Sequence, residues 1–306
     1  MLDICLLGTG GMMPMPNRFL TAMLARLNGR LLLIDCGEGT QVTLKLLGWG
    51  FKAIDTICFT HFHADHISGL PGMLLTIGNS GRTEPLTLIG PQGLQEIVEG
   101  LRKIAPELPF DIEYKEIKQN DADNQQSILL NGFQINLLFV EHLIPCLAYK
   151  ISVPRKGKFD IKKANQLTLP KHLWSILQKG EEIIHDGKKY TPDMVMGEKR
   201  KGISVCYCTD SRPVSQLIPF IENSNLFICE GMYGEEEKLN KAIENKHMLF
   251  SEAANLAKKA NVSKLWLTHF SPALSEPELF LENATKIFEN SILGEDRKWE
   301  TLFFSE

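Results

Sequence analysis

The amino-acid sequence predicts an α/β protein in which strands and helices are layered around buried apolar cores. Eight short apolar runs have the length of strands, and amphipathic helical segments lie between them. The chain has 306 residues, of which 43% are hydrophobic and 23% are charged. These fractions are ordinary for a globular protein, so disordered and low-complexity classes are excluded. The length is sufficient to bury a large core.

The predicted strands share short runs of Leu, Ile, Val, Phe and Cys. They are expected at residues 4–7, 31–35, 56–59, 86–89, 133–140, 204–208, 226–229 and 264–268.

Helices are predicted between these strands by apolar residues that recur at helical spacing. Residues 93–104 place five apolar side chains on one face, and residues 251–260 place four. Ser251 is the predicted N-cap of the second of these helices. A third helix is expected near 68–78, and residues 120–127 read as a polar turn.

Positive charge is concentrated in one part of the chain. Between Arg155 and Lys201 there are twelve basic and six acidic residues, a net charge of +6, which leaves −10 elsewhere in a chain of net charge −4. The surrounding stretch 152–202 interrupts the pattern of strands and reads as an insertion. Two interpretations remain open, a grip on a polyanion or a solvated segment whose lysines serve solubility.

The cysteine pattern and the chain start bear on the cellular compartment. Seven scattered cysteines, most of them within apolar runs, are typical of reduced thiols rather than of a disulfide framework. No apolar run reaches the roughly 20 residues of a membrane helix, and the first residues lack a signal-peptide pattern. We therefore expect a cytoplasmic protein that does not bind membranes.

Residues 60–66, Thr-His-Phe-His-Ala-Asp-His, carry the strongest chemical signal. They follow the predicted strand 56–59, and alternation along a strand would point His61 and His63 the same way. The next turn would bring Asp65 and His66 to a neighbouring point. Two pairs of nitrogen and oxygen donors at adjacent points suit two ions such as zinc.

Three further residues at strand ends can complete two metal sites. His142 follows strand 133–140, Asp210 follows strand 204–208, and His269 follows strand 264–268. Active sites of α/β proteins gather at the carboxyl ends of strands. A carboxylate such as that of Asp210 can bridge two cations, whereas a neutral imidazole cannot. Taken singly, each of the three would read as an ordinary polar loop residue.

This constellation resembles the metallo-β-lactamase superfamily, which implies an αββα four-layer sandwich spanning residues 1–306 as one domain. Five blocks are also similar to those of the ribonuclease Z family, the endoribonucleases that remove the 3′ trailer from precursor tRNA. The blocks are residues 7–11, 33–41, 141–149, 247–254 and 267–271.

The resemblance implies two zinc ions per chain and no nucleotide cofactor. One ion would be held by His61, His63 and His142, and the other by Asp65, His66 and His269. Asp210 would bridge the two ions. Asp35 would support one of the ligand histidines.

The resemblance also implies a proton-transfer pathway. Asp65 would accept a proton from the attacking water, and His247 would donate one to the leaving 3′ oxygen. Glu230 would orient His247, or else would be a strand-end acid with a backbone partner. The glycine-containing turns at 8–11 and 68–72 would offer backbone N–H groups to the phosphate.

The insertion at 152–202 lies where ribonuclease Z carries an arm that clamps tRNA. The resemblance implies that this arm binds precursor tRNA in a homodimer and reaches across to the partner's site. The chain departs from the family at Lys171 and His172, where a Gly-Pro is usual, and at Ala273, where arginine is common. The residues expected to contact the RNA are Arg155, Lys156, Lys158, Lys162 and Lys163.

Three other functions remain open from the sequence. A small-molecule phosphodiesterase or related hydrolase would keep the metals without tRNA specificity, and the altered arm and Ala273 favour this reading. A metal-bound RNA-binding protein without turnover would not need Asp65 and His247 together. An iron-based redox relative would be expected to carry a partner domain, for which no residues are left.

Overall fold

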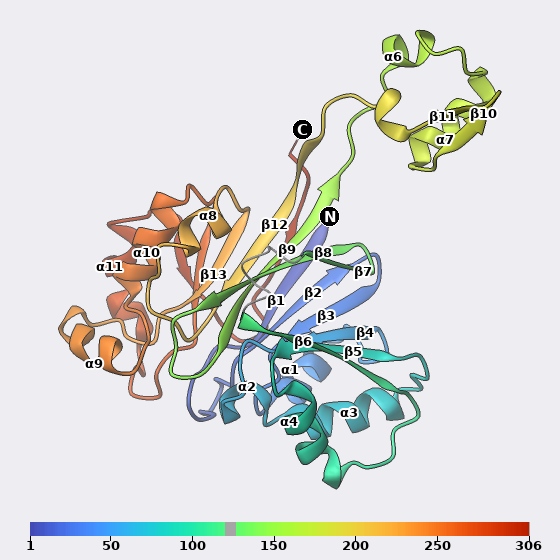
Figure 1. Ribbon diagram of the computed structural model, residues 1–306. Helices are drawn as coiled ribbons and strands as arrows, with labels where there is room; N and C mark the ends of the chain where they lie inside the picture. Colours follow the sequence, from blue (N-terminus) through green and yellow to red (C-terminus); the bar gives the residue numbers. More distant parts are fainter. Residues whose placement is uncertain (120–126, 306) are drawn as a thin grey trace. The chain divides into compact units, whose positions relative to one another are not determined.

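The computed structural model describes residues 1–119 and 127–305, which fold into two compact units. The larger unit comprises Met1–Val153 and Ser204–Phe303, and the smaller comprises Pro154–Ile203 with the residues after Phe303. The larger unit contains two seven-stranded sheets (Figure 1). The polar turn predicted at 120–127 falls, except for Ser127, outside the described residues.

The first sheet is mixed. The strand pairs between β16 and β3 are antiparallel, and the strand pairs between β3 and β6 are parallel. In sheet order the strands are β16 (Trp299–Leu302), β1 (Leu2–Gly8), β2 (Ala22–Leu27), β3 (Arg30–Ile34), β4 (Ile54–Cys58), β5 (Leu86–Pro91) and β6 (Ile112–Ile117).

The second sheet is also mixed. Its strands from β15 to β12 pair parallel, and β9, β8 and β7 pair antiparallel. In sheet order the strands are β15 (Ser291–Leu293), β14 (Leu265–Thr268), β13 (Leu226–Glu230), β12 (Arg200–Cys208), β9 (Cys146–Arg155), β8 (Phe133–Val140) and β7 (Ser127–Leu130).

Helices cover one face of each sheet, and the other faces meet (Figure 1). The hydroxyl of Tyr149 on β9 donates to the carbonyl of Phe59, 2.7 Å away, and so ties the second sheet to the first. The helices on the first sheet are α1 (Thr40–Leu47), α3 (Leu70–Asn79) and α4 (Leu94–Leu101), and those on the second are α8 (Leu217–Ile221), α10 (Phe250–Lys259) and α11 (Glu282–Thr285). The larger unit is therefore an αββα sandwich.

Strand β1 shows how the sequence builds the two-layered core. Cys5 and Leu7 pack in the cluster beneath α1, α3 and α4, whereas Ile4 and Leu6 are equally buried but outside that cluster. Since side chains alternate along a strand, Ile4 and Leu6 face the second sheet. Burial on both faces explains why this strand is a continuous apolar run rather than an alternating one.

The smaller unit has its own apolar cluster. Asp160 caps its first helix by accepting the backbone N–H groups of Lys162 and Lys163. The unit begins two residues after, and ends one residue after, the insertion expected at 152–202. Its elements are α6 (Ile161–Asn165), α7 (Trp174–Lys179), β10 (Ile183–His185) and β11 (Lys188–Tyr190), and its buried core is Ala164, Leu169, Leu177, Tyr190 and Val195.

All eight predicted strands are present, but the start of one predicted helix needs correction. Helix α10 begins at Phe250 with Leu249 at its N-cap, so Ser251 lies inside the helix. The Glu252 side chain accepts the Leu249 N–H at 3.0 Å and replaces the expected serine cap. The helix expected near 68–78 is α3, and a further short helix, α2 (Ala64–Ile67), precedes it.

Two expectations about membranes and thiols can also be compared with the structure. Within residues 1–119 and 127–305, no helix has the length and apolar character needed to span a bilayer. All seven cysteines are buried free thiols, which confirms the expected absence of a disulfide framework.

Candidate metal centre

The predicted metal ligands meet at the carboxyl ends of strands from both sheets. His61 and His63 lie in the loop after β4 rather than on the strand, so strand alternation is not what brings them together. The parallel register of β12, β13 and β14 brings the loops after these strands to one edge. The remaining ligands are Asp65 and His66 in α2, His142 after β8, Asp210 after β12 and His269 after β14.

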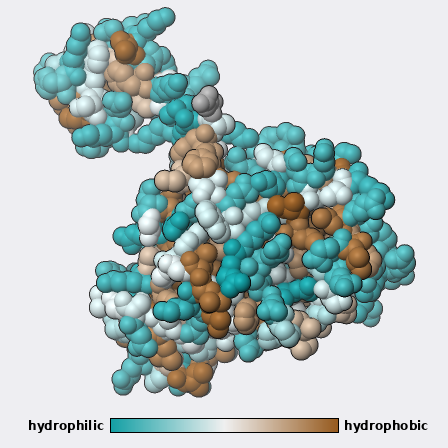
Figure 2. All heavy atoms as spheres, turned by 180° about the vertical axis from the view of Figure 1, so that it is seen from behind, coloured by the Kyte–Doolittle hydropathy of each residue, from teal (hydrophilic) through white to brown (hydrophobic). Residues whose placement is uncertain are grey.

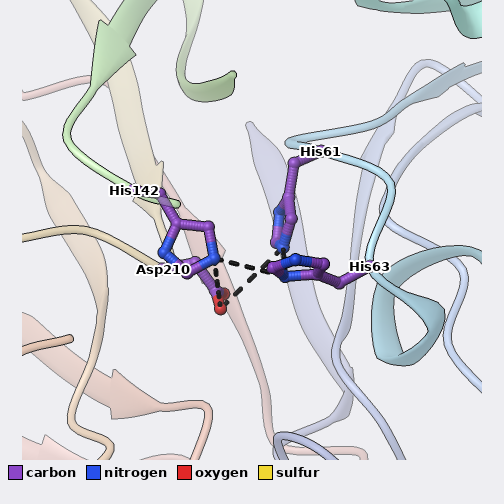
Figure 3. Close-up of side chains that lie close together, drawn as sticks. All are labelled: His61, His63, His142 and Asp210. Atoms are coloured by element: carbon purple, nitrogen blue, oxygen red, sulfur yellow. Dashed lines mark hydrogen bonds and ion pairs between the residues drawn. The ribbon is translucent and has the colours of Figure 1, made fainter. Parts of the chain in front are cut away.

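Three histidines and one aspartate form the first group, with their side chains turned toward one another (Figure 3). Nδ1 of His63 lies 3.0 Å from Nε2 of His61 and 3.2 Å from Nε2 of His142. Zinc–nitrogen bonds of about 2.0–2.1 Å in a tetrahedron separate neighbouring nitrogens by about 3.3 Å. The three nitrogens are therefore spaced as ligands of one ion.

Asp65, His66 and His269 form the second group. Nε2 of His66 lies 3.2 Å from Nε2 of His269, and Oδ2 of Asp65 lies 3.4 Å from the same His269 nitrogen. All three side chains are largely buried. A second ion could be held here by two imidazoles and one carboxylate.

Asp210 stands between the two groups and presents one oxygen to each. Its Oδ1 lies 3.9 Å from Nε2 of His61 and 3.8 Å from Nε2 of His142. Its Oδ2 lies 3.1 Å from Nε2 of His66 and 3.2 Å from Nε2 of His269. This is the arrangement required of a carboxylate that bridges two cations.

The charge balance of the centre also fits metal ions. Every ion-pair partner of the buried Asp210 carboxylate among the described residues is a histidine. Burial lowers the pKa of His61, His63 and His142 and keeps these imidazoles neutral, with lone pairs free to coordinate. A divalent cation supplies the positive charge that the Asp210 carboxylate and the three neutral imidazoles of the first group lack.

Asp35 and Thr60 contact the Nδ1 atoms of His66 and His61, on the side of each ring away from the metal groups. Oδ2 of Asp35 accepts a hydrogen bond from Nδ1 of His66 at 2.9 Å, and Thr60 donates its backbone N–H to Oδ1 at 2.8 Å. The Thr60 hydroxyl also lies 3.0 Å from Nδ1 of His61. Burial lowers the pKa of His66, but Asp210 and Asp35 outweigh it and raise the pKa above its usual value. Sequence reasoning missed Thr60, although it directly precedes His61.

His247 lies beside both groups. Its ring centre is 5.5 Å from that of His142 and 5.6 Å from that of His269, and its Nδ1 donates to Oε2 of Glu230 at 3.1 Å. Burial lowers the pKa of His247, but the Glu230 carboxylate outweighs this effect and raises it to about 9. His247 is therefore protonated at neutral pH and can donate a proton.

Glu230 has both of the contacts that the sequence left open as alternatives. Besides its bond to His247, Oε2 accepts the backbone N–H of Met248 at 3.0 Å, and Oε1 accepts that of Ser211 at 2.5 Å. Arg212, which sequence reasoning missed, donates to the carbonyl of His247 and pairs with Glu252. These contacts fix the segment that carries His247.

In the first glycine-containing turn three of the N–H groups expected to bind a phosphate are already engaged in backbone hydrogen bonds. The N–H groups of Thr9 and Gly10 donate to the carbonyl of Phe19, and that of Gly11 donates to Phe270. In the second turn, the N–H of Gly69 donates to the carbonyl of Cys36. These four donors hold the fold together.

The five basic residues predicted to bind RNA all lie in the smaller unit, whose visible surface is mostly hydrophilic (Figure 2). Lys156 donates to the carbonyl of Lys179 and Lys163 to that of Met196. Arg155 lies over the Phe304 ring, 5.0 Å from its centre. Within the described chain no side-chain partner is present for Lys158 or Lys162, which are exposed.

Comparison with known proteins finds relatives that match this chain over nearly its whole length. It is 58% identical to a "Ribonuclease Z" of Clostridium kluyveri, with 100% of both chains covered. It is 56% identical to a "Ribonuclease Z" of Clostridium acetobutylicum, with 99% of each covered. Residues 2–195 also match the family described as "Anti-Pycsar protein Apyc1".

Solved structures show the same fold at lower identity. The chain is 23% identical to human tRNase Z, short form, with 98% of each chain covered and a TM-score of 0.70. It is 20% identical to the metallo-β-lactamase fold protein YhfI from Bacillus subtilis, with a TM-score of 0.69 over 98% of this chain and 100% of the other. The αββα sandwich described above is the metallo-β-lactamase fold.

Proposed function

Since this chain belongs to the ribonuclease Z family and, through residues 2–195, to the family described as "Anti-Pycsar protein Apyc1", we propose that its metal centre cleaves precursor tRNA at the 3′ trailer. The protein is an endoribonuclease that processes tRNA 3′ ends. The match to the full-length ribonuclease Z relatives includes Asp210, His247 and His269. The match to the Apyc1 family ends at residue 195, before these three residues. The small-molecule phosphodiesterase that the sequence left open is not favoured.

One structural observation carries the mechanism, namely that Asp210 directs one carboxylate oxygen to each ligand group. The residues form a site for divalent metal, and we propose that it takes two zinc ions, one per group. When bound, such ions activate the attacking water and stabilise charge on the phosphate. The protein contributes the rigid arrangement of seven side chains that surrounds them.

We assign Asp65 first to metal binding and second to proton transfer. Burial raises the pKa of Asp65, but hydrogen bonding and attraction from His269 and His66 outweigh burial and hold it well below the usual value. The carboxylate is therefore ionised, the form that both a ligand and a proton acceptor require. Its low pKa makes it a weak base, so coordination is its main role.

His247 is the proposed proton donor to the leaving 3′ oxygen. Its ring is mostly buried and lies beside ligands of both groups. The Glu230 carboxylate stabilises the protonated form of the ring. Glu230 is a positioning residue in this scheme, because it acts through His247. Protonation of the leaving oxygen by a placed imidazolium is typically worth about 10²–10⁴-fold in rate.

The smaller unit is the proposed tRNA-binding arm. The segment Arg155–Lys201 carries a net charge of +6, and phosphate contacts from lysine and arginine supply most non-specific affinity for nucleic acids. Lys158 and Lys162 are the foremost candidates, because their ammonium groups are not engaged by the rest of the described chain. The hydrogen bonds of Lys156 and Lys163 indicate that these two also stabilise the arm itself.

We also propose that the protein is a homodimer in which each arm serves the partner's centre. Apolar side chains of α1 support a self-association surface, since Val42 and Leu46 are 50% and 61% exposed beside a hollow of about 630 Å³. A cytoplasmic location is proposed from the seven free thiols.

The decisive test of the activity is cleavage of an end-labelled precursor tRNA by protein of measured metal content. A single cut at the junction with the trailer, lost in Asp65→Ala, would confirm the proposal. A fully metallated protein that hydrolyses a simple phosphodiester but leaves the precursor intact would overturn it.

A second experiment separates the arm from the centre. A variant with residues 154–203 replaced by a short Gly-Ser linker should lose precursor cleavage and keep hydrolysis of bis(p-nitrophenyl) phosphate. Equal loss of both activities would contradict a role of the arm in RNA binding.

A further inference from the structure

A loop near the N-terminus reaches the second ligand group from outside the histidine motif. The N–H of Gly11 donates to the carbonyl of Phe270 at 3.0 Å, and the N–H of Phe270 donates to Thr9 at 2.9 Å. The next N–H, that of Met12, donates to Oδ2 of Asp65 at 2.7 Å. The loop therefore joins the chain segment of His269 to the side chain of Asp65.

Gly11 lies directly against the imidazole of His269. A Cβ atom placed on Gly11 would be 2.7 Å from Cε1, 2.9 Å from Nε2 and 3.0 Å from Nδ1 of that ring. Real Cβ atoms essentially never approach other heavy atoms within 3.0 Å, so any side chain here would displace the ring. Because the ring is only 1% exposed, it cannot move away into solvent.

His269 differs from other ligand histidines in how its ring is fixed. Nδ1 of His66 bonds to Asp35, and Nδ1 of His61 lies within hydrogen-bond distance of Thr60. By contrast, Nδ1 of His269 is buried and has no hydrogen-bond partner among residues 1–119 and 127–305. A ring without an outer hydrogen bond depends on packing for its direction.

We propose that Gly11 is a positioning residue that sets the direction of the His269 imidazole and thereby the metal affinity of the Asp65–His66–His269 group. The absence of a side chain at Gly11 lets the backbone approach the face of the His269 ring. The hydrogen bonds from the N–H groups of Gly11 and Met12 hold His269 and Asp65 in fixed positions relative to each other. The inference rests on the proposed metal centre, but it concerns a residue outside the ligand set.

The test is a zinc titration of the metal-free protein with a competing chromophoric chelator. Gly11→Ala should lose about 10–100-fold in affinity for one of two ions, the range expected when the support of a ligand is removed. His269→Ala serves as the reference for loss at the second group, and Gly11→Ala should resemble it. The matched control is Gly100→Ala, because Gly100 is exposed on α4 and has nothing within 4 Å of a built Cβ.

The outcomes are distinguishable. Two ions bound by Gly11→Ala as tightly as by the unmodified protein, or equal weakening of both ions, would overturn the inference. Failure of the unmodified protein itself to bind zinc would instead remove the proposed metal centre. Should Gly11→Ala fail to fold, the double variant with His269→Ala must fold, since the smaller side chain removes the clash. A double variant that also stays unfolded would overturn the inference.

Discussion

Nδ1 of His66 lies 2.9 Å from Oδ2 of Asp35, and neither side chain has any exposed surface. Because Nδ1 donates its hydrogen to the carboxylate, the lone pair of His66 is on Nε2, which faces His269 and Asp210. Asp35 itself is held by two bonds from Thr60. A chain of hydrogen bonds thus determines which ring nitrogen faces the metal centre.

Replacing Asp35 with asparagine should weaken metal binding at the second group by about 10–100-fold. The asparagine would remove the charge that favours the Nδ1–H form of His66. Metal content after dialysis against graded zinc concentrations measures the effect. Asp186→Asn is the control, because Asp186 is exposed in the smaller unit. Unchanged zinc retention in Asp35→Asn would contradict the role of Asp35.

Replacing Asp210 with alanine should remove more metal than any other single ligand change, because Asp210 faces both groups. We expect both ions to be weakened and precursor cleavage to fall by more than the roughly 10–100-fold expected for an outer partner. The comparison is His63→Ala, whose ring faces only the first group. Quantitative metal analysis of both variants decides the matter. Retention of one tightly bound ion in Asp210→Ala would show that Asp210 does not bridge.

The pH dependence of kcat should show an alkaline limb that belongs to His247. Its pKa is raised to about 9, so the proton donor is present at neutral pH and is lost as the pH rises through that value. In Glu230→Gln the largest of the charges that raise the pKa of His247 is gone, while burial, which lowers it, remains. The limb should therefore move to lower pH, and it should be absent from His247→Ala. A limb that stays in place or moves upward in Glu230→Gln would contradict this assignment.

The affinity for precursor tRNA should fall as the salt concentration rises, because lysines of the arm are proposed to contact phosphates of the RNA. Each lysine–phosphate contact contributes roughly 0.7–0.9 to the slope of log affinity against log salt concentration. Removing Lys158 and Lys162 together by alanine should lower the slope by about 1.5 and leave hydrolysis of a small phosphodiester unchanged. The double variant Lys258→Ala, Lys259→Ala on α10 is the control. An equal fall of the slope in the control would show that the effect is one of overall charge.

The sequence predicted many strands of the two sheets and the seven residues that the structure brings together in the two ligand groups. Strand β8 was predicted with its observed bounds, because its ends coincide with polar residues and turns. Strands β2 and β9 were not predicted, although both are largely buried. Strand β9 contains Lys150 and Pro154, and β2 contains Arg26, which break up the apolar runs. Pairing with neighbouring strands, which a single sequence does not display, decided their conformation.

Helix ends were less well predicted than strands. Ser251 is a favourable N-cap residue, yet Glu252 and the buried Leu249 place the start of α10 two residues earlier. Local capping preferences amount to about 0.5–2 kcal/mol, and burial of an apolar side chain such as Phe250 is of similar or larger size. Packing therefore outweighed the local signal.

The sequence by itself determined which side chains are available to bind metal, because these are set by residue type and by their positions at strand ends. Only the tertiary structure decided how those side chains act together. It placed one oxygen of Asp210 on each group, chose the ring nitrogen of His66 through Asp35, and set Gly11 against His269. Gly11 and His269 are 258 positions apart along the chain. Contacts at such a distance come from the packing of two sheets, and neither periodicity nor local propensity encodes that packing.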